Sequence, residues 1–357
     1  MDEVDSLYRD ALEWYEREQF ARAAVAFERL LARDPSHVEA RYKLANALKE
    51  QGDWDSAARH YESLLRLVPG HAEALNNLGA AHQYLDRPQD AERCYRQAIA
   101  LRPALAQPYL NLGRLLQAAG RDGEACAVFR AALDRGLDAG VFGHLLRASS
   151  GEAAAKAPEA YVRETFDAFA AQFDRHLVDT LDYRVPQELA RWAVRHFGSR
   201  NIDVLDLGCG TGLVGESLKP WCNLLVGVDL SHRMLEAARR RGCYDELHAA
   251  ELEQWLGQAP AARFDLAVAA DVFIYIGSLD KVFALLQKTL RPEGVMAFSV
   301  ESCEGDEWRL LASGRYAQSA SYVRRLSERH GFQVERCTST SIRRGVPGEL
   351  YALVKKR

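Results

Sequence analysis

A 34-residue repeat runs through residues 4–137 and limits what this part of the chain can fold into. Aligning the sequence with itself at this offset places prolines in one column, small residues in two others and aromatic residues in a fourth. The columns hold Pro35, Pro69 and Pro103; Ala11, Ala45, Gly79 and Gly113; Ala23, Ala57, Ala91 and Ala125; and Phe27, Tyr61, Tyr95 and Phe129. Small residues let two helices approach closely, an aromatic ring fills the space beside them, and proline ends the second helix. The repeat therefore predicts two short helices per unit.

These columns resemble the tetratricopeptide repeat (TPR) family, whose units stack into an all-α solenoid. Four units cover Val4 to Leu137, and Leu137 stands where the fourth unit would have its proline. The resemblance implies a concave surface, built from the first helix of each unit, on which extended peptides dock. Polar side chains expected there are Lys43, Asn46, Asn77, Asn111 and Arg114.

Asn77 and Asn111 lie one repeat apart and so fall on one line along that surface. This is similar to the asparagine ladder with which some TPR proteins hold a peptide backbone, because an amide both donates and accepts hydrogen bonds. Lys43 interrupts the ladder in the second repeat. The alternative interpretation is that these are ordinary solvated side chains.

The pattern changes between the repeats and the rest of the chain. We expect a TPR domain over residues 1–140, a capping helix and linker over 141–158, and a second domain over 159–357. The second domain opens with an apolar stripe at helical spacing from Tyr161 to Leu177, formed by Val162, Phe166, Phe169, Phe173 and Leu177. This stripe predicts an amphipathic helix.

A glycine-rich motif, I-D-V-L-D-L-G-C-G-T-G, begins at Ile202. An apolar run followed by glycines at 208, 210 and 212 predicts a strand, a tight loop and a helix, which together present backbone N–H groups to a nucleoside-like ligand. Glycines at 210, 212 and 215 also fit the G-x-G-x-x-G fingerprint of dinucleotide sites. Two acids favour a different ligand. Asp206 would repel a pyrophosphate but can engage an ammonium group, and Asp229 ends the next predicted strand.

This combination resembles the class I S-adenosylmethionine (SAM) methyltransferases. The resemblance implies an α/β, Rossmann-like domain with a seven-stranded sheet, whose last pair is antiparallel, SAM as cofactor and S-adenosylhomocysteine (SAH) as product. Asp229 would bind the ribose hydroxyls, Met234 would pack on the adenine, and Glu251 would face the adenine amine. The complete expected cofactor set is Asp206, Gly208, Cys209, Gly210, Asp229, Leu230, Met234, Glu251, Leu252 and Asp271.

The chain also resembles a recognisable group of TPR–methyltransferase fusions with a lid helix of the form F-D-x-x-A-x-x-F-D. Residues 166–174 match that lid with Ala170 offset by one position.

Methyl transfer from a sulfonium needs an acceptor held in line with the methyl group in a dry site, and a base if the acceptor is a hydroxyl or amine. Candidate bases are Asp271, Tyr275, Tyr183, Tyr161, His176 and Glu301, none of which is distinguished by its spacing. Arg184 and Arg343 are candidates to bind an acceptor carboxylate. For each of these residues the alternative is a structural or merely solvated side chain.

Composition excludes several classes of function. The net charge of −4 offers no basic field for nucleic acid. Seven scattered cysteines without a C-x-x-C pair, and histidines without ligand spacing, predict neither disulfides nor a metal site. The acidic start lacks the pattern of a secretory signal, and no apolar stretch reaches the length of a membrane span. We therefore expect a cytoplasmic protein.

Together these features predict a multidomain SAM-dependent methyltransferase that modifies an O or N nucleophile of a peptide or protein docked by its TPR domain. One alternative is a methyltransferase of small metabolites whose repeats mediate partner binding or oligomerisation, a homodimer included. A second is a scaffold protein whose methyltransferase fold binds SAM weakly.

Overall fold

The structure is a computed structural model that describes residues 3–152, 154–169, 183–198, 201–343 and 345–357. It divides into two compact units, one ending at Leu146 and one running from Arg147 to Arg357. The boundaries expected from the sequence, at 140 and 158, lie on either side of this division.

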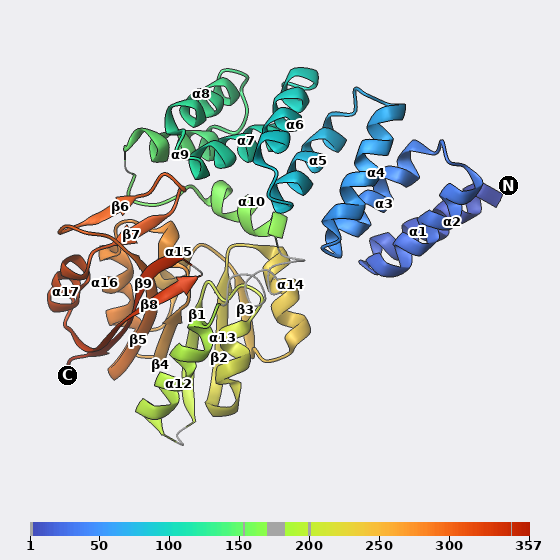
Figure 1. The fold of residues 1–357 in the computed structure, drawn as a ribbon. Helices are drawn as coiled ribbons and strands as arrows, with labels where there is room; N and C mark the ends of the chain where they lie inside the picture. The colour runs from blue at the N-terminus through green and yellow to red at the C-terminus, as the bar shows by residue number, and fades with distance from the viewer. Residues whose placement is uncertain (1–2, 153, 170–182, 199–200, 344) are drawn as a thin grey trace. The chain divides into compact units, whose positions relative to one another are not determined.

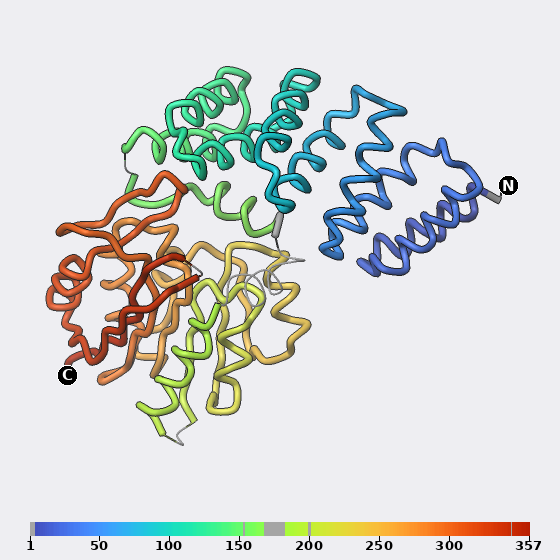
Figure 2. Tube along the Cα trace, in the orientation of Figure 1, coloured from blue at the N-terminus to red at the C-terminus, as the bar shows by residue number. Residues whose placement is uncertain are grey.

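The first unit is a series of helix pairs, which Figure 2 follows along the chain from blue to green. Each 34-residue repeat forms one pair, as the repeat predicts. The pairs are α1 (Glu3–Glu16) with α2 (Phe20–Arg33), α3 (Val38–Glu50) with α4 (Trp54–Leu67), α5 (Ala72–Tyr84) with α6 (Pro88–Leu101), and α7 (Ala106–Ala118) with α8 (Asp122–Leu133), and α9 (Ala139–Ser150) follows them.

Small residues and aromatic rings meet within the pairs, as the columns of the repeat predict. A Cβ atom on Gly79 would lie 2.6 Å from Cε1 of Tyr95, and one on Gly113 would overlap the ring of Phe129. Both rings are almost completely buried. The prediction that a small residue makes room for the aromatic ring of its own repeat is confirmed at these two positions.

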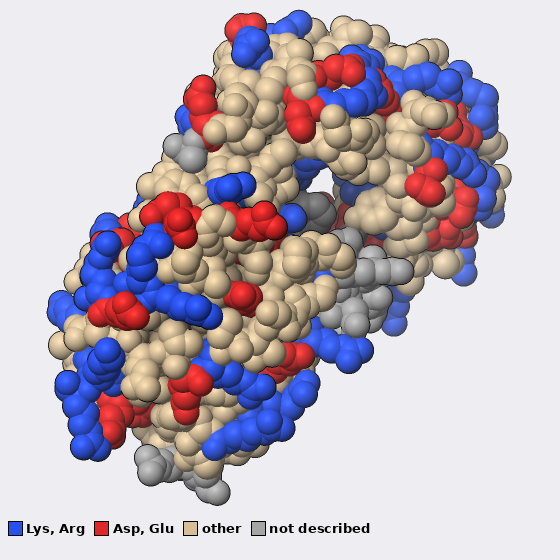
Figure 3. All heavy atoms as spheres, turned by 60° about the vertical axis from the view of Figure 1, so that its left-hand side comes forward, with Lys and Arg blue, Asp and Glu red and all other residues tan. Residues whose placement is uncertain are grey.

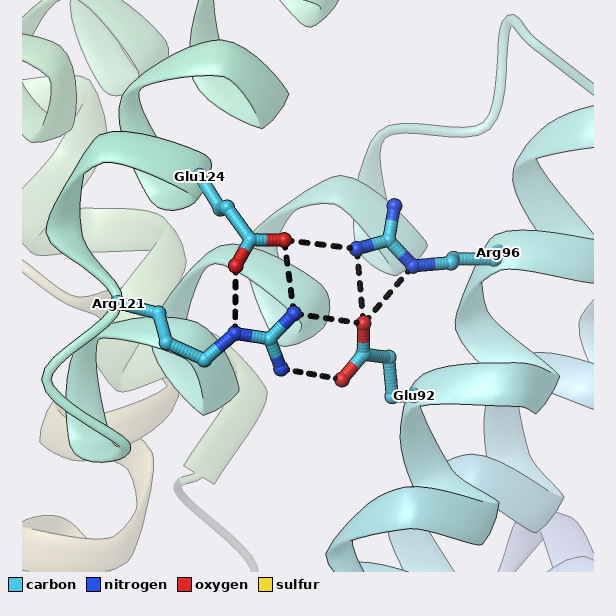
Figure 4. A network of polar contacts seen from close by, with 4 residues as sticks. All are labelled: Glu92, Arg96, Arg121 and Glu124. Carbon is cyan, nitrogen blue, oxygen red and sulfur yellow. Dashed lines mark hydrogen bonds and ion pairs between the residues drawn. The ribbon is translucent and has the colours of Figure 1, made fainter.

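An ion-pair network joins the third and fourth repeats (Figure 4). Arg121, which precedes α8, directs its guanidinium at Glu124 of α8 at 2.7 Å and at Glu92 of α6 at 2.6 Å. Glu92 also pairs with Arg96 at 2.7 Å, and the pKa of Glu92 is lowered chiefly by its hydrogen bonds from Arg121. The network therefore links α6 to α8 at the surface of the repeats.

The second unit is built on one mixed sheet with the strand order β3-β2-β1-β4-β5 (Figure 1). These five strands are parallel where they pair, β9 lies antiparallel to β5, and β8 antiparallel to β9. Their bounds are β1 (Ile202–Leu207), β2 (Cys222–Asp229), β3 (Glu246–Ala249), β4 (Phe264–Ala269), β5 (Leu290–Ser302), β8 (Phe332–Arg343) and β9 (Val346–Lys355). They are the seven strands expected from the sequence, with the antiparallel pair where it was expected.

The prediction of seven strands is nevertheless too low, because the described residues form nine. β6 (Trp308–Leu310) and β7 (Tyr316–Gln318) pair with each other, and β7 continues the sheet beside Glu301 and Ser302 at the end of β5. Each extra strand has three residues, too few for an alternating apolar pattern to be visible in the sequence.

Helices bury both faces of the sheet, which makes a three-layered unit (Figure 1). One face packs against α15 (Leu252–Gln258), α16 (Asp280–Thr289) and α17 (Ala320–Arg329), and the other against α12 (Val185–Phe197) and α13 (Leu213–Leu218). A parallel sheet covered on both faces places ligands at the carboxyl ends of its strands, so the loops at that edge are where a site is expected.

Four further helical elements among the described residues complete this unit. They are α10 (Glu159–Phe169), α14 (His232–Arg241) and the short helices η2 (Lys219–Trp221) and η3 (Phe273–Tyr275). The described part of the amphipathic stripe forms α10, whereas Phe173, Leu177 and the candidate base His176 lie outside the described residues.

Basic and acidic side chains are interspersed over the face drawn in Figure 3, in keeping with the small net charge. Among the described residues, every helix is too short or too polar to cross a membrane.

Candidate functional site

A loop of left-handed glycines joins β1 to α13. Gly208, Gly210 and Gly212 have φ of 62°, 54° and 95°, which residues with a side chain rarely adopt. A Cβ on Gly208 would also lie 2.6 Å from Cγ2 of Val272. Backbone conformation and lack of space together explain why glycine is needed here.

Asp229 is held by main-chain donors on both of its carboxylate oxygens. Oδ2 accepts the N–H of Gly210 at 2.9 Å, and Oδ1 accepts the N–H of Ser231 at 2.8 Å. Burial raises the pKa of Asp229, while the same main-chain hydrogen bonds oppose that rise. A carboxylate fixed in this way, with lone pairs remaining on each oxygen, can accept two hydrogen bonds from a diol. Leu230 follows it directly, and Met234 is buried on α14.

Asp206 lies beneath the glycine loop, 1% exposed, and its Oδ2 accepts a hydrogen bond from the hydroxyl of Tyr244 at 2.7 Å. Burial raises the pKa of Asp206 to about 7, and the Tyr244 hydrogen bond opposes this rise. Tyr244 occupies the space against Gly212 and Gly215, where a Cβ on Gly215 would overlap its ring. The sequence gave no sign of Tyr244, because it is an isolated aromatic residue far from the motif.

Cys209 is buried in the loop, and burial raises the pKa of its thiol well above the ordinary value. A thiol of this kind is a packing group and not a reactive thiolate.

Glu251 caps α15, with Leu252 as the first residue of that helix. Its carboxylate accepts the N–H of Gln254 at 2.8 Å and pairs with Lys156 at 3.2 Å. Lys156 also pairs with Glu253 at 3.4 Å. The acid expected near the adenine amine is therefore also a helix cap and an ion-pair partner.

Lys156 belongs to an extended strap, residues 154–157, that is bonded to the loop after η3. The carbonyl oxygen of Ala155 accepts the N–H groups of Gly277 and Ser278 at 2.8 and 2.9 Å, and the N–H of Ala157 donates to the carbonyl of Tyr275 at 2.9 Å. These bonds fix the residues that lead into α10.

Helix α10, expected from the sequence to be a lid, contacts both sides of the site. Asp167 accepts a hydrogen bond from the Ser231 hydroxyl at 2.5 Å, next to Asp229, and Phe166 lies edge-on to Tyr275 with ring centres 5.4 Å apart. The ring centres of Tyr161 and Tyr275 are 6.4 Å apart. Asp167 and Ser231 were not singled out from the sequence, although Asp167 lies within the lid motif.

Beyond the glycine loop, four charged residues meet at the ends of β4, β5 and β8, a set we call the acceptor cluster: Asp271, Glu301, Arg315 and Arg343. Arg343 pairs with Asp271 at 3.4 Å and with Glu301, and Glu301 also accepts a hydrogen bond from Nε of Arg315 at 2.7 Å. Asp271 has a φ of 62°. Arg315, in the loop between β6 and β7, was missed in the sequence because nothing there predicts those strands.

Tyr183 and Tyr275 lie in the electrostatic field of this cluster. Burial raises the pKa of both hydroxyls, that of Tyr183 well above the usual value, and the Asp271 carboxylate contributes to each rise. The structure thus brings together four candidate bases, Asp271, Glu301, Tyr183 and Tyr275. Arg184, a candidate to bind an acceptor carboxylate, is exposed as the residue directly before α12.

Among the described residues, no group of three or more His, Cys, Asp or Glu side chains could hold a metal ion.

On the repeats, the two asparagines expected to form a ladder, Asn77 and Asn111, belong to a hydrogen-bonded network with Asn46 and Asn76. Oδ1 of Asn46 accepts hydrogen bonds from the Tyr61 hydroxyl at 2.5 Å and from Asn77 at 3.0 Å. Asn76 links Asn77 to Asn111, with distances of 3.1 and 2.9 Å. The sequence alignment missed Asn76, because it is not one repeat away from the others.

The network crosses α3, α5 and α7. Lys43 and Arg114 lie three residues from Asn46 and Asn111 on the same helices, a spacing that puts side chains on one helix face. Arg114 is half-buried, and the Lys43 amino group lies 5.1 Å from the centre of the Tyr15 ring.

Comparison with known families supports both parts of the sequence interpretation. Residues 205–298 match the model of a methyltransferase domain. Residues 38–104, and residues 8–49 with 79–139, match two tetratricopeptide repeat models.

Two curated methyltransferases are similar to part of this chain. The ubiquinone biosynthesis O-methyltransferase of Pasteurella multocida is 26% identical over 36% of this chain and 58% of its own length. The malonyl-[acyl-carrier protein] O-methyltransferase of Halalkalibacterium halodurans is 30% identical over 35% and 50%. The chain thus spans about half the length of these curated relatives.

Among solved structures, magnesium protoporphyrin IX methyltransferase from Synechocystis with bound SAM aligns at 17% identity and a TM-score of 0.44, over 56% of this chain and 97% of that one.

Proposed function

We propose that this chain, which joins tetratricopeptide repeats to a SAM-dependent methyltransferase domain, transfers a methyl group from SAM to an O or N nucleophile of a peptide or protein docked by the repeats. The observation that carries the catalytic half is Asp229, whose two carboxylate oxygens are fixed by the N–H groups of Gly210 in the glycine loop and of Ser231, which caps α14.

The residues of the site fit SAM. Asp229 would accept the two ribose hydroxyls, Met234 would pack on the adenine, and the N–H groups of the loop around Gly208 and Gly210 would face the methionyl part. Asp206 would attract the ammonium group, which favours its ionised form. Bound SAM supplies a methyl group on a positively charged sulfur.

The chain's own residues would provide orientation and exclusion of water. The lid helix α10 reaches α14 through Asp167 and η3 through Phe166, so it covers the approach from both sides. The acceptor cluster would hold the nucleophile, and Asp271 is the carboxylate we expect to take its proton.

Docking by the repeats is supported by what these repeats do in general, which is to bind other proteins. The asparagine network would form a polar surface whose amides can still hydrogen-bond to a peptide. Arg114 and Lys43 would attract acidic peptide segments. A docked substrate gains effective concentration at the catalytic domain.

A small-molecule acceptor is the second candidate function. One curated relative is an O-methyltransferase of ubiquinone biosynthesis, and the asparagines of this chain already bond to one another. In that case the repeats would serve assembly or partner binding.

The first test is calorimetric titration of the full chain with SAH. We expect a dissociation constant below about 100 μM. Weaker binding would favour the scaffold alternative and contradict methyl transfer.

The second test adds the full chain and methyl-labelled SAM to an extract of the source organism. Docking predicts label in a discrete protein or peptide and a clear loss of that label in Arg114→Glu. The matched control is Arg93→Glu on α6, whose side chain is 77% exposed and pairs only locally with Asp90. Label confined to small molecules, and equal in both variants, would contradict docking.

A further inference from the structure

The acceptor cluster is electrically balanced and enclosed. The charges of its two carboxylates and two guanidinium groups sum to zero when all four groups are ionised. The side chains of Glu301, Arg343 and Asp271 are 4%, 12% and 13% exposed, and that of Arg315 is 30% exposed. Each guanidinium already faces a carboxylate of the cluster.

Two buried atoms of this cluster have no hydrogen-bond partner among the described residues. They are Oδ1 of Asp271, an acceptor, and Nε of Arg343, a donor. The two side chains meet through their other atoms, Oδ2 and Nη1, at 3.4 Å. Buried polar atoms are nearly always paired in folded proteins, so an unpaired acceptor and an unpaired donor on two side chains that touch each other favour a ligand with both capacities.

From this we propose that the acceptor cluster binds an uncharged hydroxyl group of the substrate and presents its oxygen for methylation. This inference rests on the proposed methyltransferase function and narrows the class of methyl acceptor to hydroxyl groups. A hydroxyl donates its proton to Oδ1 of Asp271, accepts from Nε of Arg343 with one lone pair, and keeps the second lone pair for the methyl group.

A carboxylate acceptor fits poorly. It would bring a net negative charge into a balanced, desolvated cluster and face the free oxygen of Asp271. Arg343, which the sequence offered as a carboxylate ligand, is already paired with Asp271 and Glu301. A neutral amine fits less well than a hydroxyl, because its single lone pair cannot both accept from Arg343 and attack.

In the proposed step, a bond forms between the hydroxyl oxygen and the methyl carbon while the carbon–sulfur bond of SAM breaks. The electron pair of that bond stays on sulfur, which becomes the neutral thioether of SAH. The hydroxyl proton passes to Asp271. Asp271 is thus a catalytic residue, and Arg343 touches the acceptor oxygen as a hydrogen-bond donor.

The test uses the full chain saturated with SAH and labelled with nitrogen-15 in arginine. The Nε–H resonance of Arg343, assigned with Arg343→Lys, is followed while three probes of matched shape are added: phenol, aniline and benzoate. We expect phenol to shift the resonance at the lowest concentration. A larger response to benzoate or aniline, or no response to phenol, would overturn the proposal.

A variant of Asp271 and a matched control provide a second test of the proposal. Asp271→Asn is expected to weaken the phenol response at least about tenfold, since a neutral amide oxygen replaces the charged acceptor of the hydroxyl proton. SAH binding by this variant is measured in parallel, so that the phenol response is compared with the cofactor site saturated. The control is Glu293→Gln, the same carboxylate-to-amide change at an exposed pair with Arg357, and it should alter neither. An unchanged phenol response in Asp271→Asn would overturn the role of Asp271.

The product of the extract reaction supplies an independent readout. Methylation of a hydroxyl gives an ether that keeps its label in mild alkali, whereas methylation of a carboxylate gives an ester that releases labelled methanol. Most of the label released as methanol would overturn the hydroxyl inference while leaving methyl transfer intact. Failure of SAH to bind would instead contradict the proposed function itself.

Discussion

The hydroxyl of Tyr244 donates a 2.7 Å hydrogen bond to Oδ2 of Asp206 directly beneath the glycine loop. Asp206 is buried, and the hydrogen bond from Tyr244 does not compensate for the loss of water around its carboxylate, since the pKa of Asp206 stays raised to about 7. The ordinary value of an aspartate is about 3.9. This difference makes the stability of the fold depend on pH.

Asp206→Asn should make the protein more stable at pH 8 relative to wild type than at pH 4. Between pH about 4 and about 7 the folded chain keeps a proton at Asp206 that the unfolded chain releases, so the free energy of unfolding falls as pH rises through this window. A shift of about three pKa units corresponds to at most about 4 kcal/mol. Urea unfolding at both pH values measures the difference.

Asp245→Asn is the matched control for that measurement. Hydrogen bonding to Lys219 lowers the pKa of Asp245, so its contribution has the opposite sign and is lost as pH falls. If Asp206→Asn differed from wild type by the same amount at both pH values, Asp206 would not titrate in this window.

Asp229→Ala should weaken SAH binding by about 2–4 kcal/mol, because it removes two hydrogen bonds to a charged group that would bridge the ribose diol. Calorimetric titration of the full chain is the measurement, and circular dichroism shows whether the loop still folds. Unchanged affinity in a folded variant would remove Asp229 from the cofactor site.

Gly113→Ala should destabilise the repeats by about 1–3 kcal/mol, because its methyl group would overlap the ring of Phe129. Gly123→Ala is the matched control: it lies in α8 with no atom within 4 Å of its Cβ position and should be neutral or slightly stabilising. Denaturant unfolding compares the two variants. Phe129→Leu in the Gly113→Ala background should recover part of the loss, and no recovery would mean that the two side chains do not compete for space.

Arg121→Met should lower the melting temperature more at low ionic strength than in about 1 M salt, because the network in Figure 4 is electrostatic and partly exposed. Arg93→Met removes only a local pair with Asp90 and should change little at either salt concentration. Equal, salt-independent losses in both variants would contradict a stabilising role of the network.

The sequence predicted the parts of this molecule in which particular residue types recur at a fixed spacing. The aromatic and small columns of the repeat meet as expected at Gly79 and Gly113, and the glycine loop lies between strand and helix as its motif indicates. Such features are local, so they are visible in a single sequence.

The contacts that the sequence did not reveal join residues far apart in the chain. Tyr244 reaches Asp206 across 38 residues, and Arg343 reaches Glu301 across 42. Asn76 was overlooked because its role depends on the packing of neighbouring helices. No periodic pattern encodes these partners, since they are set by how the strands and helices assemble.

The strap of residues 154–157 anchors the start of α10. Ala157 is bonded to Tyr275 through the main chain, and α10 begins two residues later at Glu159. The start of α10 is therefore tied to η3 by main-chain bonds, whereas Asp167 near its end is held by the side chains of Ser231 and Arg233. The two ends of one helix thus depend on different parts of the sequence, the start on backbone geometry and the end on two side chains that a substitution can remove.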